Sequence, residues 1–361
     1  MHTPLRLGIV GLGAVAGMHL KAYEEVADVE VIGAADSSPE RAASAKKEFA
    51  FPIFASVDEL IRERKPDICC VLTPPAAHEE ATVRCANAGV HVLCEKPMAL
   101  SIRACQAMIA ACRQNGVQLC YGASYRYLPA LLIARDMILD GQLGEILLLR
   151  EYMVGGSGIS GRQTLGPSHY PLGGPGGSAM GLCDHGIHLI DAFGWMMNAG
   201  VVAVWGRGNR TGERQEPEWA QMKFTNGAMG QLLYEDGTFG TELPPEGLFA
   251  WGGGWGLGIG IVDSQKTSRA NWQSQPACIH VHGTKGALRI FYYANALFHF
   301  QHARVQQIAV PKHAVPENFA AQMSTFAQAI RSDGVAPVPG EVGLSACRAL
   351  LGLYAGTGLP V

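Results

Sequence analysis

The segment LRLGIVGLGAVA, residues Leu5–Ala16, decides the fold of the first half of the chain. Leu5–Val10 is a mostly apolar run, which is typical of a strand buried on both faces of a parallel sheet. The next six residues fit the pattern G-x-G-x-x-A and open a helix. In that pattern the first glycine allows a tight turn, the second lets the backbone approach a pyrophosphate, and the small third residue lets the helix pack on the strand. The segment therefore predicts a dinucleotide-binding turn.

The residues that follow repeat the order strand, helix, strand. Further strands are predicted at 29–35, 67–72, 90–94 and 118–121, and helices at 15–26, 39–49, 57–64, 77–88 and 102–115. This rhythm favours a parallel sheet with helices on both faces. Residues 1–122 are therefore predicted to form a doubly wound Rossmann domain that binds NAD.

Asp36 ends the second predicted strand, twenty residues after Ala16. An acidic side chain at this point accepts hydrogen bonds from the adenosine ribose and repels a 2′-phosphate, so it favours NAD over NADP. Arg41, one helical turn further on, weakens that preference. The alternative is a structural glycine turn followed by a turn-forming segment at residues 36–39.

Residues 123–361 have a different pattern. Strands are predicted at 146–154, 201–206, 220–224, 229–234, 278–282 and 288–293, and helices at 129–140, 182–197, 318–332 and 342–353. The strands alternate apolar and polar residues, which is typical of antiparallel pairing. The chain is therefore predicted to be α/β, with a C-terminal α/β domain built on a large, mostly antiparallel open sheet.

Two segments carry residues suited to chemistry. Glu95-Lys96-Pro97 follows the fourth predicted strand, at the sheet edge where ligands of parallel sheets bind. On the predicted helix 182–197, Asp184 and His188 are one turn apart. A carboxylate beside an imidazole can fix its tautomer for proton transfer. The alternatives are a solvated lysine, a buried Asp–His pair without function, or a metal pair, for which the sequence provides no further ligand cluster.

Together these segments resemble the glucose–fructose oxidoreductase/inositol dehydrogenase (Gfo/Idh/MocA) family. The resemblance is carried by the glycine turn, Thr73-Pro74-Pro75-Ala76-Ala77-His78, Glu95-Lys96-Pro97, Tyr125-Arg126, Asp184-x-x-x-His188-x-x-Asp191 and Gly283-Thr284-Lys285-Gly286. It implies a Rossmann domain, a C-terminal domain whose sheet packs face to face in dimers or tetramers, and a catalytic trio of Lys96, Asp184 and His188. Two glycine-rich segments, 155–181 and 244–260, do not match the family pattern.

The resemblance and the motifs together predict the site residues. The cofactor site is predicted to comprise Gly11, Leu12, Gly13, Ala14, Val15, Ala16, Asp36, Ser37, Arg41, Thr73, Pro74, Pro75, His78, Glu95, Lys96 and Arg126. The substrate site is predicted to comprise Lys96, Tyr125, Arg162, His169, Tyr170, Asp184 and His188, with Arg269 and Trp272 as further candidates. No metal site is predicted.

The leading functional hypothesis is hydride transfer between NAD and a secondary alcohol of a sugar, sugar derivative or cyclitol. An alternative with the same residues is an NAD-dependent glycoside hydrolase, which oxidises its substrate transiently, eliminates the aglycone, adds water and returns the hydride. A third hypothesis is a non-catalytic NAD-binding module, which retention of Lys96, Asp184 and His188 together disfavours. The sequence does not identify the sugar.

Composition excludes several classes of protein. The near balance of 28 basic and 31 acidic residues gives no electrostatic footprint for nucleic acid or an anionic membrane. The ten cysteines show no C-x-x-C spacing, which indicates buried, reduced thiols in a cytoplasmic protein. No signal peptide or apolar membrane segment is expected. Of the 45 glycines, 27 lie in residues 151–260, and Phe249–Val262 is predicted to be buried at a homo-oligomer interface or beside the substrate.

Overall fold

The structure is a computed structural model that describes residues 3–156, 181–208, 217–239, 250–251, 259–260, 278–302, 304–313 and 316–355. The chain divides into two compact units. Unit 1 comprises Met1–Ser124 and Pro316–Cys347, and unit 2 comprises Tyr125–Val315 and Arg348–Val361. A boundary near residue 122 was the sequence prediction, but Pro316–Cys347 belongs to unit 1 rather than to the second unit.

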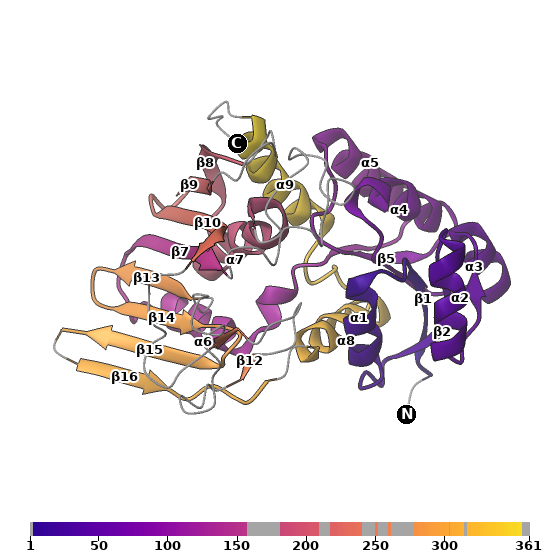
Figure 1. Cartoon of the computed structure of the whole chain (residues 1–361), viewed down its shortest axis with the longest axis horizontal. Helices are drawn as coiled ribbons and strands as arrows, with labels where there is room; N and C mark the ends of the chain where they lie inside the picture. Colours follow the sequence, from indigo (N-terminus) through magenta and orange to yellow (C-terminus); the bar gives the residue numbers. More distant parts are fainter. Residues whose placement is uncertain are drawn as a thin grey trace. The chain divides into compact units, whose positions relative to one another are not determined.

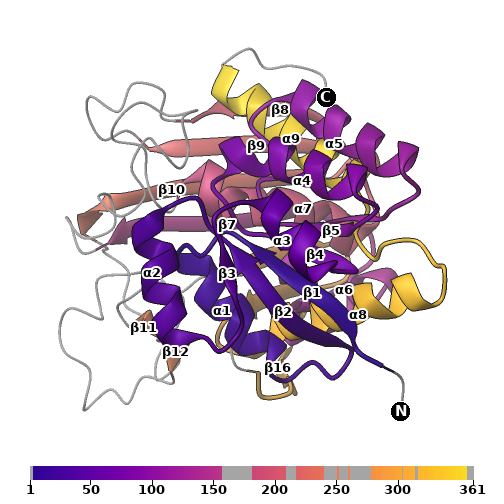
Figure 2. The same cartoon turned by 90° about the vertical axis from the view of Figure 1, so that its right-hand side faces the viewer.

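Unit 1 is built on a six-stranded parallel sheet, sheet A, in the order β3-β2-β1-β4-β5-β6. Its strands are β1 (Leu5–Val10), β2 (Val29–Ala35), β3 (Ile53–Phe54), β4 (Ile68–Val71), β5 (His91–Cys94) and β6 (Leu119–Tyr121). The strand order reverses beside β1, so the carboxyl ends of β1 and β4 flank the point where such sheets bind ligands. Figure 2 shows β1, β2 and β4 running side by side.

The helices of unit 1 begin where the sequence provides caps. The hydroxyls of Ser38, Ser56 and Ser101 accept hydrogen bonds from the first turns of three helices, which fixes their starts. The helices are α1 (Ala14–Tyr23), α2 (Pro39–Glu48), α3 (Val57–Arg64), α4 (His78–Asn87), α5 (Ile102–Gln114) and α8 (Glu317–Arg331), with the short 3₁₀ turn η1 (Pro75–Ala77). A second 3₁₀ turn, η2 (Ser124–Tyr127), begins at the last residue of the first stretch of unit 1 and continues into unit 2. Helices α1 and α8 lie on one face of sheet A, and α3 and α4 lie on the other (Figure 1).

The predicted Rossmann architecture is confirmed, with element ends within a few residues of the predicted ones. The two-residue strand β3 was not predicted because it is too short to show a period. Helix α9 (Gly340–Ala355) closes the described chain, and its first half belongs to unit 1.

Unit 2 is built on an eight-stranded sheet, sheet B, in the order β16-β15-β14-β13-β7-β10-β9-β8. Its strands are β7 (Ile146–Gly156), β8 (Val201–Arg207), β9 (Glu218–Phe224), β10 (Met229–Phe239), β13 (Ile279–Gly283), β14 (Ala287–Phe291), β15 (Ala296–Gln301) and β16 (Arg304–Ile308). Only β7 and β10 pair in parallel, so the predicted mostly antiparallel sheet is confirmed. Strands β15 and β16 were not predicted.

One face of sheet B packs against helices α6 (Pro129–Leu139) and α7 (Ile187–Met197). A Cβ at Gly230 on β10 would lie 3.2 Å from the Phe193 ring of α7, so helix and sheet approach closely there. A π-helical turn, Leu182–Gly186, directly precedes α7, where the sequence predicted a continuous α-helix. Such turns are rare and frequently occur at functional sites. A separate two-stranded pair joins β11 (Ala250–Trp251) to β12 (Ile259–Gly260).

All ten cysteines are buried, as predicted, and no disulfide joins any two of them. In the described ranges, no helix is both long and apolar enough to cross a bilayer. Several predictions lie outside the described residues: those for Arg162, His169, Tyr170, Arg269 and Trp272, and the burial of Phe249–Val262, of which only the β11 and β12 backbone is described.

Candidate active site

The turn after β1 has the geometry that its glycines predict. Gly11 has a φ of 97°, and a Cβ there would lie 2.8 Å from the backbone nitrogen of Thr73, so only glycine fits. A Cβ at Gly13 would meet nothing within 4 Å. Gly13 is the N-cap of α1 and supplies no side chain to the helix start. The first N–H groups of α1 therefore face an open surface, as anion binding requires.

Asp36, at the end of β2, lies directly beside this turn. One carboxylate oxygen accepts the N–H of Leu12 at 2.8 Å and the Nε–H of Arg41 at 3.0 Å, and the other accepts the N–H of Ser38 at 2.7 Å. Burial acts to raise the pKa of Asp36, but these donors outweigh it and hold the pKa below its ordinary value. Asp36 is therefore an ionised carboxylate, and the predicted Arg41 is its ion-pair partner.

The segment after β4 presents a polar group to the same sheet edge. Among the described residues, the buried Thr73 hydroxyl has no hydrogen-bond partner. His78 is fully buried, and its Nε2 lies 2.7 Å from the Thr73 carbonyl oxygen. Its Nδ1 lies 3.1 Å from the Pro97 carbonyl oxygen. Burial lowers the pKa of His78. His78 was predicted to line the cofactor, and its ring joins the segments that follow β4 and β5.

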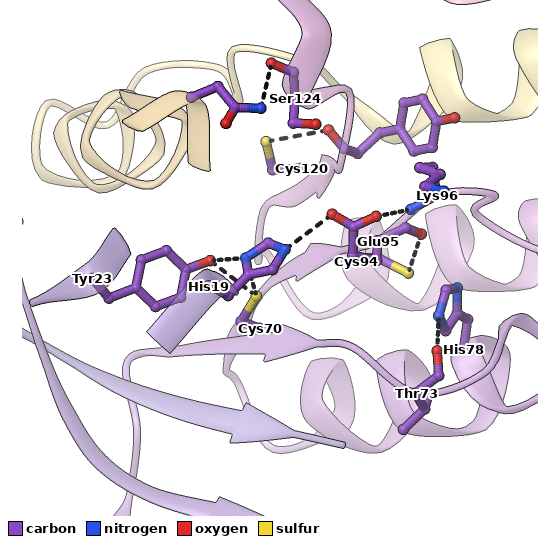
Figure 3. A network of polar contacts seen from close by, with 12 residues as sticks. His19, Tyr23, Cys70, Thr73, His78, Cys94, Glu95, Lys96, Cys120 and Ser124 are labelled. Carbon is purple, nitrogen blue, oxygen red and sulfur yellow. Dashed lines mark hydrogen bonds and ion pairs between the residues drawn. The ribbon is translucent and has the colours of Figure 1, made fainter. Parts of the chain in front are cut away.

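The segment after β5 is held by a buried contact between a carboxylate and an imidazole (Figure 3). One Glu95 oxygen lies 3.1 Å from Nε2 of His19 on α1, and the other accepts the backbone N–H of Lys96 at 2.8 Å. Nδ1 of His19 lies 2.7 Å from the Tyr23 hydroxyl, which contacts the Cys70 thiol at 3.2 Å. Burial acts to raise the pKa of Glu95, but the hydrogen bond and charge of His19 hold it below its ordinary value.

These features fit a dinucleotide. The turn leaves room for a pyrophosphate at the start of α1, Asp36 is ionised beside it, and Thr73 offers an unpaired hydroxyl at the neighbouring strand end. The residues that would hold the cofactor all belong to unit 1: Gly11, Leu12, Gly13, Ala14, Val15, Ala16, Asp36, Ser37, Thr73, Pro74, Pro75 and Lys96. Each lies on the turn after β1 or at the carboxyl end of β2, β4 or β5.

The second candidate group lies on α7 and the π turn of unit 2. The His188 ring stacks on the Tyr125 ring with centroids 3.9 Å apart and planes within 7°. Asp184 lies in the π turn and is only 7% exposed. His188, Asp184 and Tyr125, three of the predicted substrate residues, therefore lie in the same unit, and two of them are in contact.

Asp191, the last acidic residue of the helix motif, has a different partner. Both of its carboxylate oxygens accept hydrogen bonds from Arg126, at 2.6 and 2.8 Å. This two-point geometry is the strong form of an arginine–carboxylate pair. The Arg126 guanidinium also lies 5.7 Å from the Trp195 ring centroid. Arg126, predicted at the cofactor, thus joins η2 to α7 within unit 2.

A buried polar network lies between sheet B and the π turn. Glu151 on β7 is fully buried and accepts hydrogen bonds from His185 Nε2 at 3.0 Å, Tyr234 at 2.8 Å and Tyr292 at 2.5 Å. Burial and the Glu151 charge raise the pKa values of Tyr234 and Tyr292 well above the ordinary value, so both remain O–H donors. Nδ1 of His185 lies 3.3 Å from the Tyr125 hydroxyl.

Sequence reasoning missed both histidine–glutamate pairs, His19–Glu95 and His185–Glu151. Glu151 carried a signal, because strand alternation places this acidic residue on the same face as the apolar Leu149, which is buried. His19 carried a weaker one, since its position on α1 shows no partner until the sheet brings Glu95 beside it. Within the described ranges, no group of three His, Cys, Asp or Glu side chains is arranged to hold a metal ion.

Comparison with known proteins decides the family. Residues 5–123 match the oxidoreductase family with an NAD-binding Rossmann fold, GFO/IDH/MocA, and residues 131–242 match the GFO/IDH/MocA C-terminal domain. The chain belongs to the GFO/IDH/MocA oxidoreductase family. The resemblance drawn from the motifs is therefore confirmed, and with it the NAD-binding class of the Rossmann domain.

Individual GFO/IDH/MocA relatives are sugar dehydrogenases. The chain is 30% identical over 197 residues to glucose-6-phosphate 3-dehydrogenase of Bacillus subtilis, covering 55% of each chain. It is 31% identical over 192 residues to D-glucoside 3-dehydrogenase of Escherichia coli, covering 53% of each. The matched region therefore spans about half the length of these curated relatives.

The fold is similar to that of a solved oxidoreductase along nearly the whole chain. An oxidoreductase from Agrobacterium radiobacter, solved in complex with NAD+, L-tartaric acid and magnesium, superposes with a TM-score of 0.78 at 18% identity. The match covers 99% of this chain and 98% of that one. At this identity the likeness establishes the shared fold.

Proposed function

We propose that this protein is an NAD-dependent dehydrogenase that oxidises a secondary hydroxyl of a hexose or hexoside. The observation that carries the proposal is the turn after β1, where a glycine-only backbone and an open helix start lie beside the ionised Asp36. Asp36 favours NAD over NADP because its charge repels a 2′-phosphate. The names of the relatives supply the substrate class, and both act at carbon 3.

His188 is the proposed base. Its imidazole takes the proton of the reacting hydroxyl as the C–H hydride leaves that carbon. Bound NAD supplies the hydride acceptor at nicotinamide C4. Tyr125, stacked on His188, limits how the imidazole can tilt.

Lys96 is proposed to hydrogen-bond the reacting oxygen and stabilise its developing negative charge. Asp184 is proposed to orient His188 or to bind a neighbouring hydroxyl of the sugar. The assignment of Lys96, Asp184 and His188 to one reaction is based on the family motif. Support for Lys96 comes from its backbone, which Glu95 fixes at the end of β5.

The test is a screen of hexoses, hexosides and cyclitols with NAD, following NADH formation. His188→Ala is expected to lower turnover by at least about 100-fold, the lower range for a general base, with NAD affinity unchanged within a few-fold. His302→Asn, in an exposed turn of sheet B, is the matched control and should keep full activity. An equal loss of turnover and NAD affinity in His188→Ala would make His188 a structural residue.

Redox-neutral glycoside hydrolysis is separated in the same screen. That reaction releases the aglycone without accumulating NADH, whereas the dehydrogenase accumulates NADH with no aglycone release. Measuring both products on aryl glucosides distinguishes the two.

We propose further that the protein forms homo-oligomers through the face of sheet B that faces away from α7. Trp205, Trp219, Phe300 and Val305 lie on that face and are 37–58% exposed. Trp205 and Trp219 lie on β8 and β9 at one edge of the sheet, and Phe300 and Val305 lie on β15 and β16 at the other. Exposed aromatic side chains on a sheet face are typical of protein interfaces. Sedimentation of the wild type should give a dimer or tetramer, and Trp219→Glu should give monomers. A monomeric wild type would refute this proposal.

A cytoplasmic location is proposed from the ten cysteines, none of which is in a disulfide. Fractionation of the producing cells tests it, since recovery outside the cytoplasmic fraction would contradict the proposal.

A further inference from the structure

The network around Glu151 has a defined direction of hydrogen bonding. Three donors converge on its two oxygens, which suits the ionised carboxylate. Nε2 of His185 lies 3.0 Å from both a Glu151 oxygen and the Tyr292 hydroxyl. Because a carboxylate can only accept, a proton on Nε2 suits this contact, and that tautomer leaves a lone pair on Nδ1. The Tyr125 hydroxyl lies 3.3 Å from Nδ1, where it can donate to that lone pair while its oxygen accepts from Tyr293. Glu151 thus fixes the tautomer of His185, and His185 fixes the Tyr125 hydroxyl.

The network ends at the candidate base. The face of the Tyr125 ring stacks on His188 at 3.9 Å, and its edge meets His185 at 6.0 Å with planes 67° apart. The two histidines are three residues apart, on one side of the helical segment, so both can reach the same tyrosine. The Tyr125 hydroxyl also bonds with the Tyr293 hydroxyl. The ring face and the hydroxyl of Tyr125 therefore serve different histidines.

We propose that His185, fixed by Glu151, is a positioning residue that sets the His188 imidazole through Tyr125. This inference rests on the proposed function, in which His188 takes the hydroxyl proton. The bond from His185 holds the far end of the Tyr125 side chain, so the ring cannot swing away from His188. His188 is then kept within the narrow range of tilt that proton transfer needs.

Stability alone does not require this network. Well-packed apolar side chains of similar volume are generally as stabilising as a buried polar group and its ion partner. A fully satisfied polar network instead gives rigidity. The rigid element here is Tyr125, the residue in direct contact with His188.

Two substitutions of one residue separate positioning from stability. In His185→Gln the side-chain amide can occupy the place of Nε2 and keep the hydrogen bond to Glu151, but the contact with the Tyr125 hydroxyl is lost. In His185→Asn the side-chain amide can occupy the place of Nδ1 and keep the contact with the Tyr125 hydroxyl, but Glu151 loses one hydrogen-bond donor. We expect His185→Gln to keep near-wild-type stability and NAD affinity while kcat falls about 10- to 100-fold, the cost of a misplaced group. We expect His185→Asn to lose stability in urea and to keep more of kcat.

Tyr125→Phe supplies the second arm, because it removes only the hydroxyl. Because the hydroxyl also contacts Tyr293, Tyr125→Phe should lower kcat at least as much as His185→Gln does. The double variant should lose no more than Tyr125→Phe alone, since His185 acts through this hydroxyl. Additive losses, or a His185→Gln enzyme with wild-type kcat and wild-type pH dependence, would overturn the proposal.

A readout without turnover keeps the proposal separate from the proposed function. The imidazole resonances of His188, assigned by comparison with His188→Ala, are expected to change in chemical shift and titration midpoint in His185→Gln, as the stacked ring moves. If the wild type oxidises no sugar but these resonances change, the proposed function fails and the positioning role stands. If the wild type oxidises sugars and the resonances do not change, the positioning role fails.

Discussion

The His19–Glu95 pair offers the strongest single perturbation of unit 1. Its side chains are 0% and 5% exposed and lie 3.1 Å apart. Removing one partner of a buried pair leaves an uncompensated charge and costs about 3–5 kcal/mol. His19→Ala is expected to lower the free energy of unfolding by this amount. Of the two donors to Glu95 described above, only the backbone N–H of Lys96 then remains.

Glu95→Gln made in the His19→Ala background removes the negative charge that His19→Ala leaves uncompensated on Glu95. The double variant should therefore be more stable than the sum of the single losses predicts, with a coupling of about 1.5–3 kcal/mol, the usual worth of a charged hydrogen bond. The matched control is Arg103→Ala, which breaks a 2.9 Å pair with Glu79 whose side chains are 77% and 28% exposed. Loss of that exposed pair should lower the free energy of unfolding by at most about 1 kcal/mol.

The assay must report on unit 1. All six tryptophans lie in Tyr125–Val315, so their fluorescence follows unit 2. Hydrogen exchange of β4 and β5 peptides across a urea series measures the free energy of unfolding of unit 1 directly. Additive single losses, or a His19→Ala cost no greater than that of Arg103→Ala, would refute a stabilising role for the buried His19–Glu95 contact.

Three further predictions concern unit 1. Asp36→Ser should shift the ratio of kcat/KM for NAD to kcat/KM for NADP by at least about tenfold toward NADP, because relieving about 1.4 kcal/mol of repulsion of the 2′-phosphate gives a tenfold change. An unchanged ratio would contradict the role of Asp36. The control is Glu40→Gln on α2, which should leave the ratio unchanged. Gly11→Ala should abolish NAD binding in a fluorescence titration, because its Cβ would lie 2.8 Å from the Thr73 nitrogen, whereas Gly17→Ala on α1 meets nothing within 4 Å and should bind normally. In the folded protein the pKa of Glu95 is below its ordinary value of 4.5. The carboxylate therefore contributes its full stabilisation above pH 4.5, and this stabilisation is lost as the pH falls through the native pKa. Below pH 4.5 the urea midpoint of the wild type should therefore fall more steeply with pH than that of Glu95→Gln.

The sequence was sufficient for unit 1 because its signals are local. The glycine turn, the serine caps and the short apolar strands each depend on residues close in the chain, and the parallel sheet follows from their order. Asp36 was found for the same reason, since it lies at a fixed distance from the turn. Pro316–Cys347 could not be assigned to unit 1, because its docking depends on long-range packing.

The candidate site was predictable only where a motif marked it. Lys96, Asp184 and His188 stand in recognisable patterns, whereas the residues that hold them do not. His19 and Glu95 are 76 positions apart, and His185 and Glu151 are 34 apart, so only the fold brings each pair together. Both pairs have the same arrangement: a buried carboxylate fixes a histidine, whose other ring nitrogen contacts a tyrosine hydroxyl.

The π turn was missed for a related reason. The period of residues 182–197 is helical throughout, and the sequence does not show where the helix widens. The turn places His185 within bonding distance of Glu151, so its geometry follows from the tertiary network rather than from local preference.

The proposed reaction moves a hydride from a secondary carbon of a hexoside to NAD. The most direct test supplies a hexoside deuterated at carbon 3 and examines the reduced cofactor by mass spectrometry. We expect NADH formed by the wild type to carry the deuterium, and His188→Ala, with NAD still bound, to form almost none. Unlabelled NADH would contradict oxidation at carbon 3, and aglycone release without net NADH would contradict a dehydrogenase.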